Sequence, residues 1–292
     1  MTALGSLIDP VARLATAPVR LPIRIALERL FEPEPFDAEP DDAGLFGPDS
    51  VAWRIHGDTA VLVGALRALL VQAMHPEVVA GVVDHSRFRD DPLGRLRRTS
   101  DWVTTVTFAP RARAEAAIDA LAAVHARVEG VSHRGVRYRA SEPPLLAWVH
   151  NTLVDAFLRA HQRYGPGISV EDADRYVTEM RTIGLRLGAD PVPGTAVDLR
   201  RWVREHPDVG DSPGRRETHR FLASPPLSIE YRAPYALLHQ GALAIVPRAL
   251  RPLATPPRPL APEATWCATA VLRLVLGPSP RRVEAELRLS HG

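Results

Sequence analysis

Hydrophobic residues recur with a helical period through most of the chain, and residues 111–130 give the clearest example. In this stretch Ile118, Leu121, His125 and Val128 are spaced by three, four and three residues, which places all four on one face of a helix. The charged residues of the stretch fall on the other faces. The pattern predicts one continuous helix over 111–130, with the His125 side chain turned toward the interior.

A histidine on an apolar face needs a partner, because burying an imidazole without one costs roughly 1–3 kcal/mol. The partner can be a hydrogen bond, an opposite charge or a metal ion. Residues 144–164 repeat the arrangement, since His150 shares a helical stripe with Leu146, Leu153 and Phe157. The sequence therefore predicts two inward-facing histidines on two helices.

Several other segments also read as helices. Residues 59–74 are hydrophobic almost all round, which is typical of the central helix of a bundle, and Pro76 is expected to end it. Ser169 begins a capping-box pattern that predicts a helix to about residue 187. Residues 103–108 are rich in β-branched side chains, but we prefer a helix there. Further helices are expected within 6–31 (two short ones), 77–85, 93–106, 199–205, 218–222, 235–245 and 265–276.

These elements predict an all-α fold, a single globular helical bundle, because neither an internal repeat nor a βαβ alternation is present. Three parts are expected along the chain. Residues 1–50 hold the N-terminal helices and a proline-rich, acidic linker or lid, and residues 51–190 form the helical core. Residues 191–292 form a proline-rich helical part that packs on that core.

Charge and cysteine content narrow the functional classes. The 36 basic residues are all arginine and are offset by 34 acidic ones for a net charge of +2, with the signs mixed along the chain. This distribution gives no reason to expect nucleic-acid binding. The single cysteine, Cys267, excludes an internal disulfide and any cluster held by several thiolates.

No transmembrane segment or export signal is expected. The most apolar run, residues 59–74, is shorter than the roughly 20 residues of a membrane span and contains Arg67. The first residues have neither a basic start nor a long apolar stretch. We therefore expect a cytoplasmic protein.

The chain also lacks the common nucleotide-binding, zinc-protease and serine-hydrolase motifs. What remains is His125 and His150, an arginine cluster that ends at Thr99, and His75 and His85 on the segment between the central helix and that cluster. By itself, an inward histidine is more often a hydrogen-bonded core residue than a metal ligand. The arginine cluster is either a solvated helix end or a clamp for carboxylates or phosphates, because guanidinium groups bind such anions through paired hydrogen bonds.

Three strings together resemble the family of latex-clearing protein (rubber oxygenase) and the MpaB-type oxygenases. They are MHPEVVAGVVDHSRFRDDPLGRLRRT, AVHARVEG and LLAWVHNTLVDAFL, and the resemblance runs from about residue 61 to about residue 180. Members of that family are α-helical, with a globin-like core that holds haem b through one histidine. They cleave carbon–carbon double bonds of isoprenoid chains with O₂.

The resemblance implies roles for particular residues. His125 matches the histidine that ligates the haem iron, and Arg95 and Thr99 match an arginine and a threonine that the family places beside the haem. Positions i and i+4 share a helix face, so Arg95 and Thr99 can both point at one cofactor. His150 is the second choice of iron ligand, and its alternative role is a hydrogen bond that fixes helix packing.

The chain departs from the family pattern at the distal side of the haem. Where the rubber-cleaving enzymes have a lysine that can bind the iron, Arg98 stands here, and a guanidinium that stays protonated is a poor metal ligand. Their distal glutamate has its nearest counterpart in Glu77. Because those enzymes are exported to reach an insoluble polymer, rubber is not the expected substrate of this chain.

The resemblance thus predicts a haem b-dependent oxygenase in which His125 holds the iron and an apolar pocket admits O₂ and a small hydrophobic unsaturated substrate, an isoprenoid or a lipid. The main alternative is a haem-free helical protein that binds a lipid or isoprenoid, with His125 and His150 as polar residues of the core. A third reading is an interaction module whose arginine-rich turn recruits an acidic partner.

Overall fold

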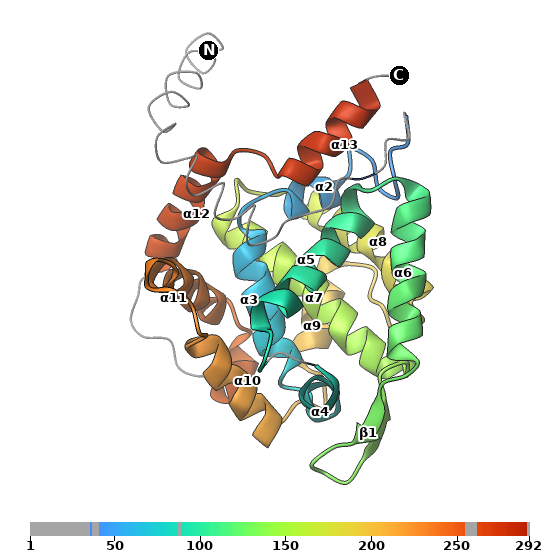
Figure 1. Ribbon diagram of the computed structural model, residues 1–292, viewed down its shortest axis with the longest axis vertical. Helices are drawn as coiled ribbons and strands as arrows, with labels where there is room; N and C mark the ends of the chain where they lie inside the picture. The colour runs from blue at the N-terminus through green and yellow to red at the C-terminus, as the bar shows by residue number, and fades with distance from the viewer. Residues whose placement is uncertain (1–35, 37–40, 87–88, 255–261, 291–292) are drawn as a thin grey trace.

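The computed structural model describes Phe36 and residues 41–86, 89–254 and 262–290, and these residues form a predominantly helical molecule (Figure 1). The all-α prediction is confirmed. The helices are α2 (Val51–His56), α3 (Val61–Gln72), α4 (Pro76–His85), α5 (Pro92–Phe108), α6 (Arg111–His125), α7 (Pro143–Tyr164), α8 (Val170–Arg186), α9 (Ala196–Arg204), α10 (Pro213–Ala223), α11 (Ile229–Ala244), α12 (Pro262–Leu276) and α13 (Pro280–Ser290), with a 3₁₀ turn at Arg248–Leu253. The two short helices predicted within 6–31 lie outside the described residues.

Helices α3 and α7 form the centre of the bundle, and α11 packs against α3 (Figure 1). Their side chains meet in one large apolar cluster that includes Leu70 of α3, Phe157 of α7 and Leu243 of α11. Gly64 allows the close approach, because a Cβ atom at this position would lie 2.7 Å from the Phe157 ring and 3.1 Å from its Cα. The prediction of a buried central helix within residues 59–74 is confirmed.

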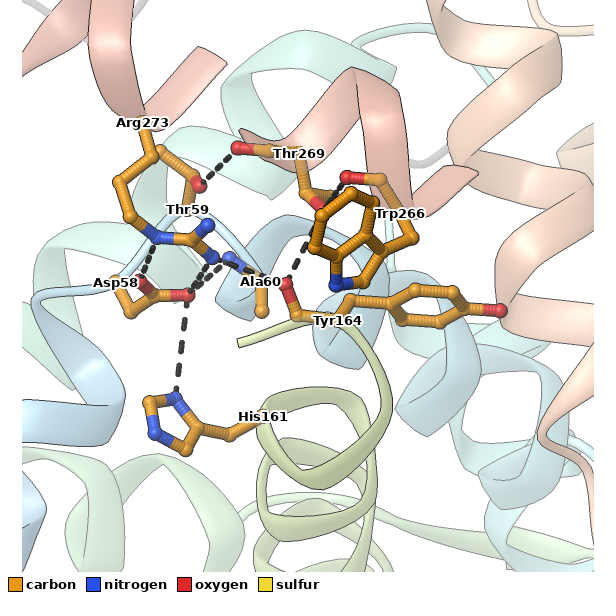
Figure 2. Close-up of polar contacts among 8 residues, drawn as sticks. All are labelled: Asp58, Thr59, Ala60, His161, Tyr164, Trp266, Thr269 and Arg273. Carbon is orange, nitrogen blue, oxygen red and sulfur yellow. Dashed lines mark hydrogen bonds and ion pairs between the residues drawn. The ribbon is translucent and has the colours of Figure 1, made fainter. Parts of the chain in front are cut away.

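Polar contacts around Asp58 join the start of α3 to the end of α7 and to α12 (Figure 2). Arg273 of α12 donates to both carboxylate oxygens of Asp58 and, through Nη2, to the carbonyl oxygen of Tyr164 at 3.0 Å. The Thr59 hydroxyl donates to the carbonyl oxygen of Thr269 at 3.0 Å. Helix α12 is therefore fixed to the core by charge and hydrogen bonds as well as by apolar packing.

The segment before α2, expected to be an extended surface linker or lid, is packed against the body where it is described. Phe36 is buried in one apolar cluster with Trp53 of α2, Phe108 of α5 and Ala285 of α13, and Arg281 of α13 lies over its ring. A carboxylate oxygen of Asp42 accepts a hydrogen bond from the backbone N–H at the start of α6, at 2.7 Å. These contacts connect the segment to α6 and to α13, the last helix of the described chain.

A β-hairpin corrects the prediction of a helix over 111–130. Helix α6 ends at His125, and β1 (Glu129–Val131) pairs antiparallel with β2 (Arg137–Arg139). Gly130 lies in β1, and only a residue without a side chain fits there, because a Cβ atom would lie 2.6 Å from the Tyr138 hydroxyl. The Tyr138 hydroxyl in turn donates to Asp84 of α4 at 2.8 Å. Gly130 thus allows the hairpin to close over a tyrosine that is anchored on α4.

Two helices were missed and two are longer than expected. Helices α2 and α13 had no predicted counterpart, while α10 and α11 begin several residues before the expected positions. Among the described residues no single helix has the length and apolar composition of a membrane span, and only α3 and α4 taken together, across a bend of 106°, meet that criterion.

Candidate functional site

Helices α5 and α6 are joined at a tight corner and diverge away from it (Figure 1). Trp102 of α5 donates a hydrogen bond from Nε1 to the carbonyl oxygen of Ala117 of α6 at 3.1 Å, which fixes the narrow part of the pair. Arg95 lies about two helical turns before Trp102 on α5, and His125 lies about two turns after Ala117 on α6. At about 5.4 Å per turn, each is about 11 Å along its helix from the contact. Both residues therefore lie where the two helices have diverged.

His125, the predicted iron ligand, is the last residue of α6 and is half-buried. Its Nδ1 atom is buried, and neither ring nitrogen makes a hydrogen bond to any residue that the structure describes. Burial lowers the pKa of His125, so its imidazole is neutral at pH 7. A neutral ring with a free lone pair is the form that binds a metal.

Arg95 is half-buried near the start of α5 and faces α3, α4 and α10. Within the described part of the chain its guanidinium makes no hydrogen bond or ion pair, and burial and then the nearby Arg98 lower its pKa. It lines a mostly apolar cavity of about 30 Å³ together with Leu69, Val79 and Thr218. The cavity has room for about one water molecule.

Thr99 is exposed, and its hydroxyl donates to the carbonyl oxygen of Arg95 at 3.1 Å. Threonines within helices often make this bond to the preceding turn. Arg98 is exposed as well and pairs with Asp91, whose side chain caps the first turn of α5. In the structure described here, Thr99 and Arg98 therefore support the turn that carries Arg95.

His150, the second candidate ligand, is buried between α7 and α8. A Cβ atom on Gly184 of α8 would lie 2.7 Å from both Nε2 and Cδ2 of the His150 ring, so the ring fills the space that the missing side chain leaves. Burial lowers the pKa of His150 to about 4. This geometry favours the packing role that the sequence left open for His150.

Glu77, the counterpart considered for the distal glutamate, is buried in the first turn of α4 and fully occupied. It accepts hydrogen bonds from the Ser132 hydroxyl at 2.8 Å and from Arg134 at 2.5 and 3.1 Å. Burial alone would raise its pKa, but these hydrogen bonds outweigh burial and lower it. Glu77 thus fastens the turn of the β-hairpin to α4.

The sequence analysis noted His75 but did not identify the group of ligand-type side chains to which it belongs, away from His125. His75, His206 and Asp208 place one nitrogen or oxygen atom each within 4.8 Å of the others. The short spacing of His206 and Asp208 was visible in the string EHPDVG, but their proximity to His75 depends on the fold. His206 also lines a cleft of about 610 Å³, together with Trp202 and four prolines.

Comparison with known proteins gives one positive result. The family model described as ER-bound oxygenase mpaB/B'/Rubber oxygenase, catalytic domain, matches residues 53–290, which runs from within α2 to the end of α13. Searches of curated proteins and of solved structures give no match. Because the family match covers most of the chain, the protein belongs to the mpaB and rubber oxygenase catalytic-domain family.

Proposed function

We propose that the protein is a haem b-dependent oxygenase that acts with O₂ on a hydrophobic unsaturated substrate, an isoprenoid or a lipid. Membership of an oxygenase family supports the reaction class. The observation that carries the assignment of His125 is its neutral imidazole, which has a buried Nδ1 and no hydrogen-bond partner among the described residues. An unpartnered imidazole is costly unless something binds it.

The side chains fit a haem chemically. A neutral histidine is a common axial ligand of haem iron, and a guanidinium pairs well with a carboxylate such as a haem propionate. Arg95 is suited to this pairing because it has no counter-ion in the described part of the chain. The cavity beside Arg95 is about 30 Å³, whereas ligand pockets are roughly 300–1,000 Å³, so haem binding would require the surrounding helices to separate.

When bound, the haem iron would supply the oxygen chemistry, and the protein would provide binding, orientation and polarity. His125 would hold the iron through a ring nitrogen without first losing a proton, because burial already keeps the ring neutral. Arg95 would pair with a propionate, and Thr99 would hold the helical turn beneath it. The valines of α4 that face Arg95 would exclude water and accept an apolar chain.

Absorption spectroscopy tests the proposal. Protein produced with a haem supply should show a Soret band that shifts with CO, and His125→Ala should lose it. His133→Ala is the matched control, because His133 is exposed in the hairpin and makes no hydrogen bond or ion pair with the described residues. A colourless wild-type protein, or a His125→Ala variant that keeps the full Soret band, would contradict the assignment.

The cleft beside Trp202 favours a second candidate function, a haem-free carrier of a lipid or isoprenoid. This cleft is about 610 Å³ and exists without any movement of the helices. A carrier would bind a fluorescent fatty acid equally well before and after His125→Ala, and Trp202→Ala would weaken that binding. An oxygenase would consume O₂ with an unsaturated lipid, and His125→Ala would abolish the consumption.

A further inference from the structure

His75, His206 and Asp208 come together where the corner between α3 and α4 meets the segment after α9. His75 precedes α4 directly and is 3% exposed, whereas His206 is half-buried and Asp208 is exposed. The group therefore extends from the interior to the surface. A metal ion could reach such a site from solvent.

The site is held in place from several sides. The backbone N–H of Gly210 donates to the carbonyl oxygen of Met74 at 2.9 Å, which ties the segment of His206 and Asp208 to the residue before His75. The His206 ring lies between Trp148 and Trp202, with both ring centroids 4.7 Å away. Rings packed in this way lose little further freedom when they bind an ion, which favours affinity.

Both imidazoles are in the protonation state that a metal requires. Burial, followed by the nearby His206, lowers the pKa of His75 to about 4, and burial also lowers the pKa of His206. Both rings are therefore neutral at pH 7. Nδ1 of His75 is buried without a hydrogen bond and lies 3.4 Å from Oε2 of Glu77. A buried nitrogen without a hydrogen bond is costly unless something binds the ring.

We propose that His75, His206 and Asp208 bind a divalent transition-metal ion, with Zn²⁺ as the representative case. Two imidazoles and one carboxylate are a common ligand set for such ions, whereas Mg²⁺ and Ca²⁺ prefer oxygen ligands only. Ligand atoms around tetrahedral zinc lie about 3.4 Å apart, so the observed limit of 4.8 Å requires only small side-chain shifts.

Three protein ligands leave a fourth position for water or another molecule. His206 also lines the cleft of about 610 Å³, so the site borders the cleft. The ion would thus join the corner before α4 to the segment after α9 and could bind an anionic group in the cleft. This site shares no ligand with the proposed haem site at His125.

A zinc titration tests the proposal. Untagged protein is first freed of metal with a chelator, and its affinity for zinc is then measured by competition with a chromophoric zinc-binding dye. One equivalent should bind, Co²⁺ should give the visible absorption bands of a bound ion, and Mg²⁺ should not compete. His206→Ala and Asp208→Asn should each weaken zinc binding by more than the roughly 10–100-fold that loss of an outer partner costs. His206 is half-buried and Asp208 is exposed, so both variants should fold even if His75→Ala does not.

His133→Ala serves again as the control and should bind zinc as the wild type does. The haem content measured in the same samples should not change in His206→Ala or Asp208→Asn, so failure of one proposal leaves the other open to its own test. The metal site is overturned if wild-type protein binds zinc no more tightly than these variants. It is also overturned if Mg²⁺ competes equally or if His125→Ala removes the zinc.

Discussion

Arg67 of α3 and Asp155 of α7 form an ion pair in which the two side chains are only 1% and 2% exposed. Nε of Arg67 also donates to the carbonyl oxygen of Ile245 at 3.0 Å, so the guanidinium joins α3, α7 and the end of α11. In the sequence, Arg67 is the charge that interrupts the most apolar run, residues 59–74. In the structure it is the charged centre of the bundle, at the contact between its two principal helices.

Breaking this pair should be strongly destabilising. Arg67→Ala or Asp155→Ala should each lower the free energy of unfolding by about 3–5 kcal/mol, because the remaining charge stays buried without a partner. The double variant Arg67→Met/Asp155→Leu should recover a large part of that loss. Urea unfolding measures all three.

The exposed pair of Arg201 and Asp198 provides the control, and Arg201→Ala should change stability by less than about 1 kcal/mol. If Arg67→Ala lowered the free energy of unfolding no more than Arg201→Ala does, the buried pair would not contribute to stability as its burial indicates.

Gly184→Ala should destabilise the protein through His150. The new Cβ atom would lie 2.7 Å from a buried ring, and overpacking of this kind costs about 1–3 kcal/mol. Alanine gains about 1 kcal/mol of helix propensity over glycine, so a net loss of up to about 2 kcal/mol is expected in thermal or urea unfolding. Gly194→Ala is the control, because nothing lies within 4 Å of a Cβ atom there.

A double-mutant cycle separates this clash from a general effect on α8. In the His150→Ala background the Gly184→Ala substitution should lose most of its cost, because the ring it would meet is gone. Equal costs in the two backgrounds would show that His150 does not determine the space beside Gly184.

His56 should make stability depend on pH. Nδ1 of His56 lies 2.7 Å from the Thr107 hydroxyl, which itself donates to Val103, so Nδ1 must donate. Nε2 then accepts from the Tyr176 hydroxyl at 2.9 Å. Both nitrogens of the neutral ring are thus satisfied, and burial lowers the pKa of His56 to about 3.

The unfolded chain takes up a proton at His56 below a pH of about 6.5, but the folded protein does so only near pH 3. Stability should therefore fall as the pH decreases between these values, by about 3 kcal/mol at pH 4 for this residue alone. When the free energy of unfolding is measured in urea between pH 7 and pH 4, it should decrease less with falling pH for His56→Gln than for the wild type. An equal decrease in both proteins would mean that His56 does not titrate as its burial indicates.

The helical core could be predicted from periodicity because most of its helices are long and amphipathic or wholly buried, as at residues 59–74 and 144–164. The hairpin after His125 could not, because its strands are three residues long and too short for an alternating pattern. The environments of His150 and Glu77 depend on Gly184 and Arg134, which lie far away in sequence. The spacing of residues along the sequence predicts which face of a helix a side chain occupies, but it does not predict which residues of other elements that side chain contacts.

Arg95 offers a final prediction that separates stability from function. Its guanidinium is half-buried beside apolar side chains and has no partner among the described residues, so Arg95→Leu should leave the free energy of unfolding unchanged within about 1 kcal/mol or raise it. The same substitution should weaken haem binding about 10- to 100-fold, because a hydrogen bond to a charged group contributes about 1.5–3 kcal/mol. Arg204→Leu, at an exposed position at the end of α9, should leave haem binding unchanged. Thermal unfolding and haem titration on the same preparations test both effects. A large loss of stability with normal haem binding would make Arg95 a structural residue, and the propionate would then need another partner.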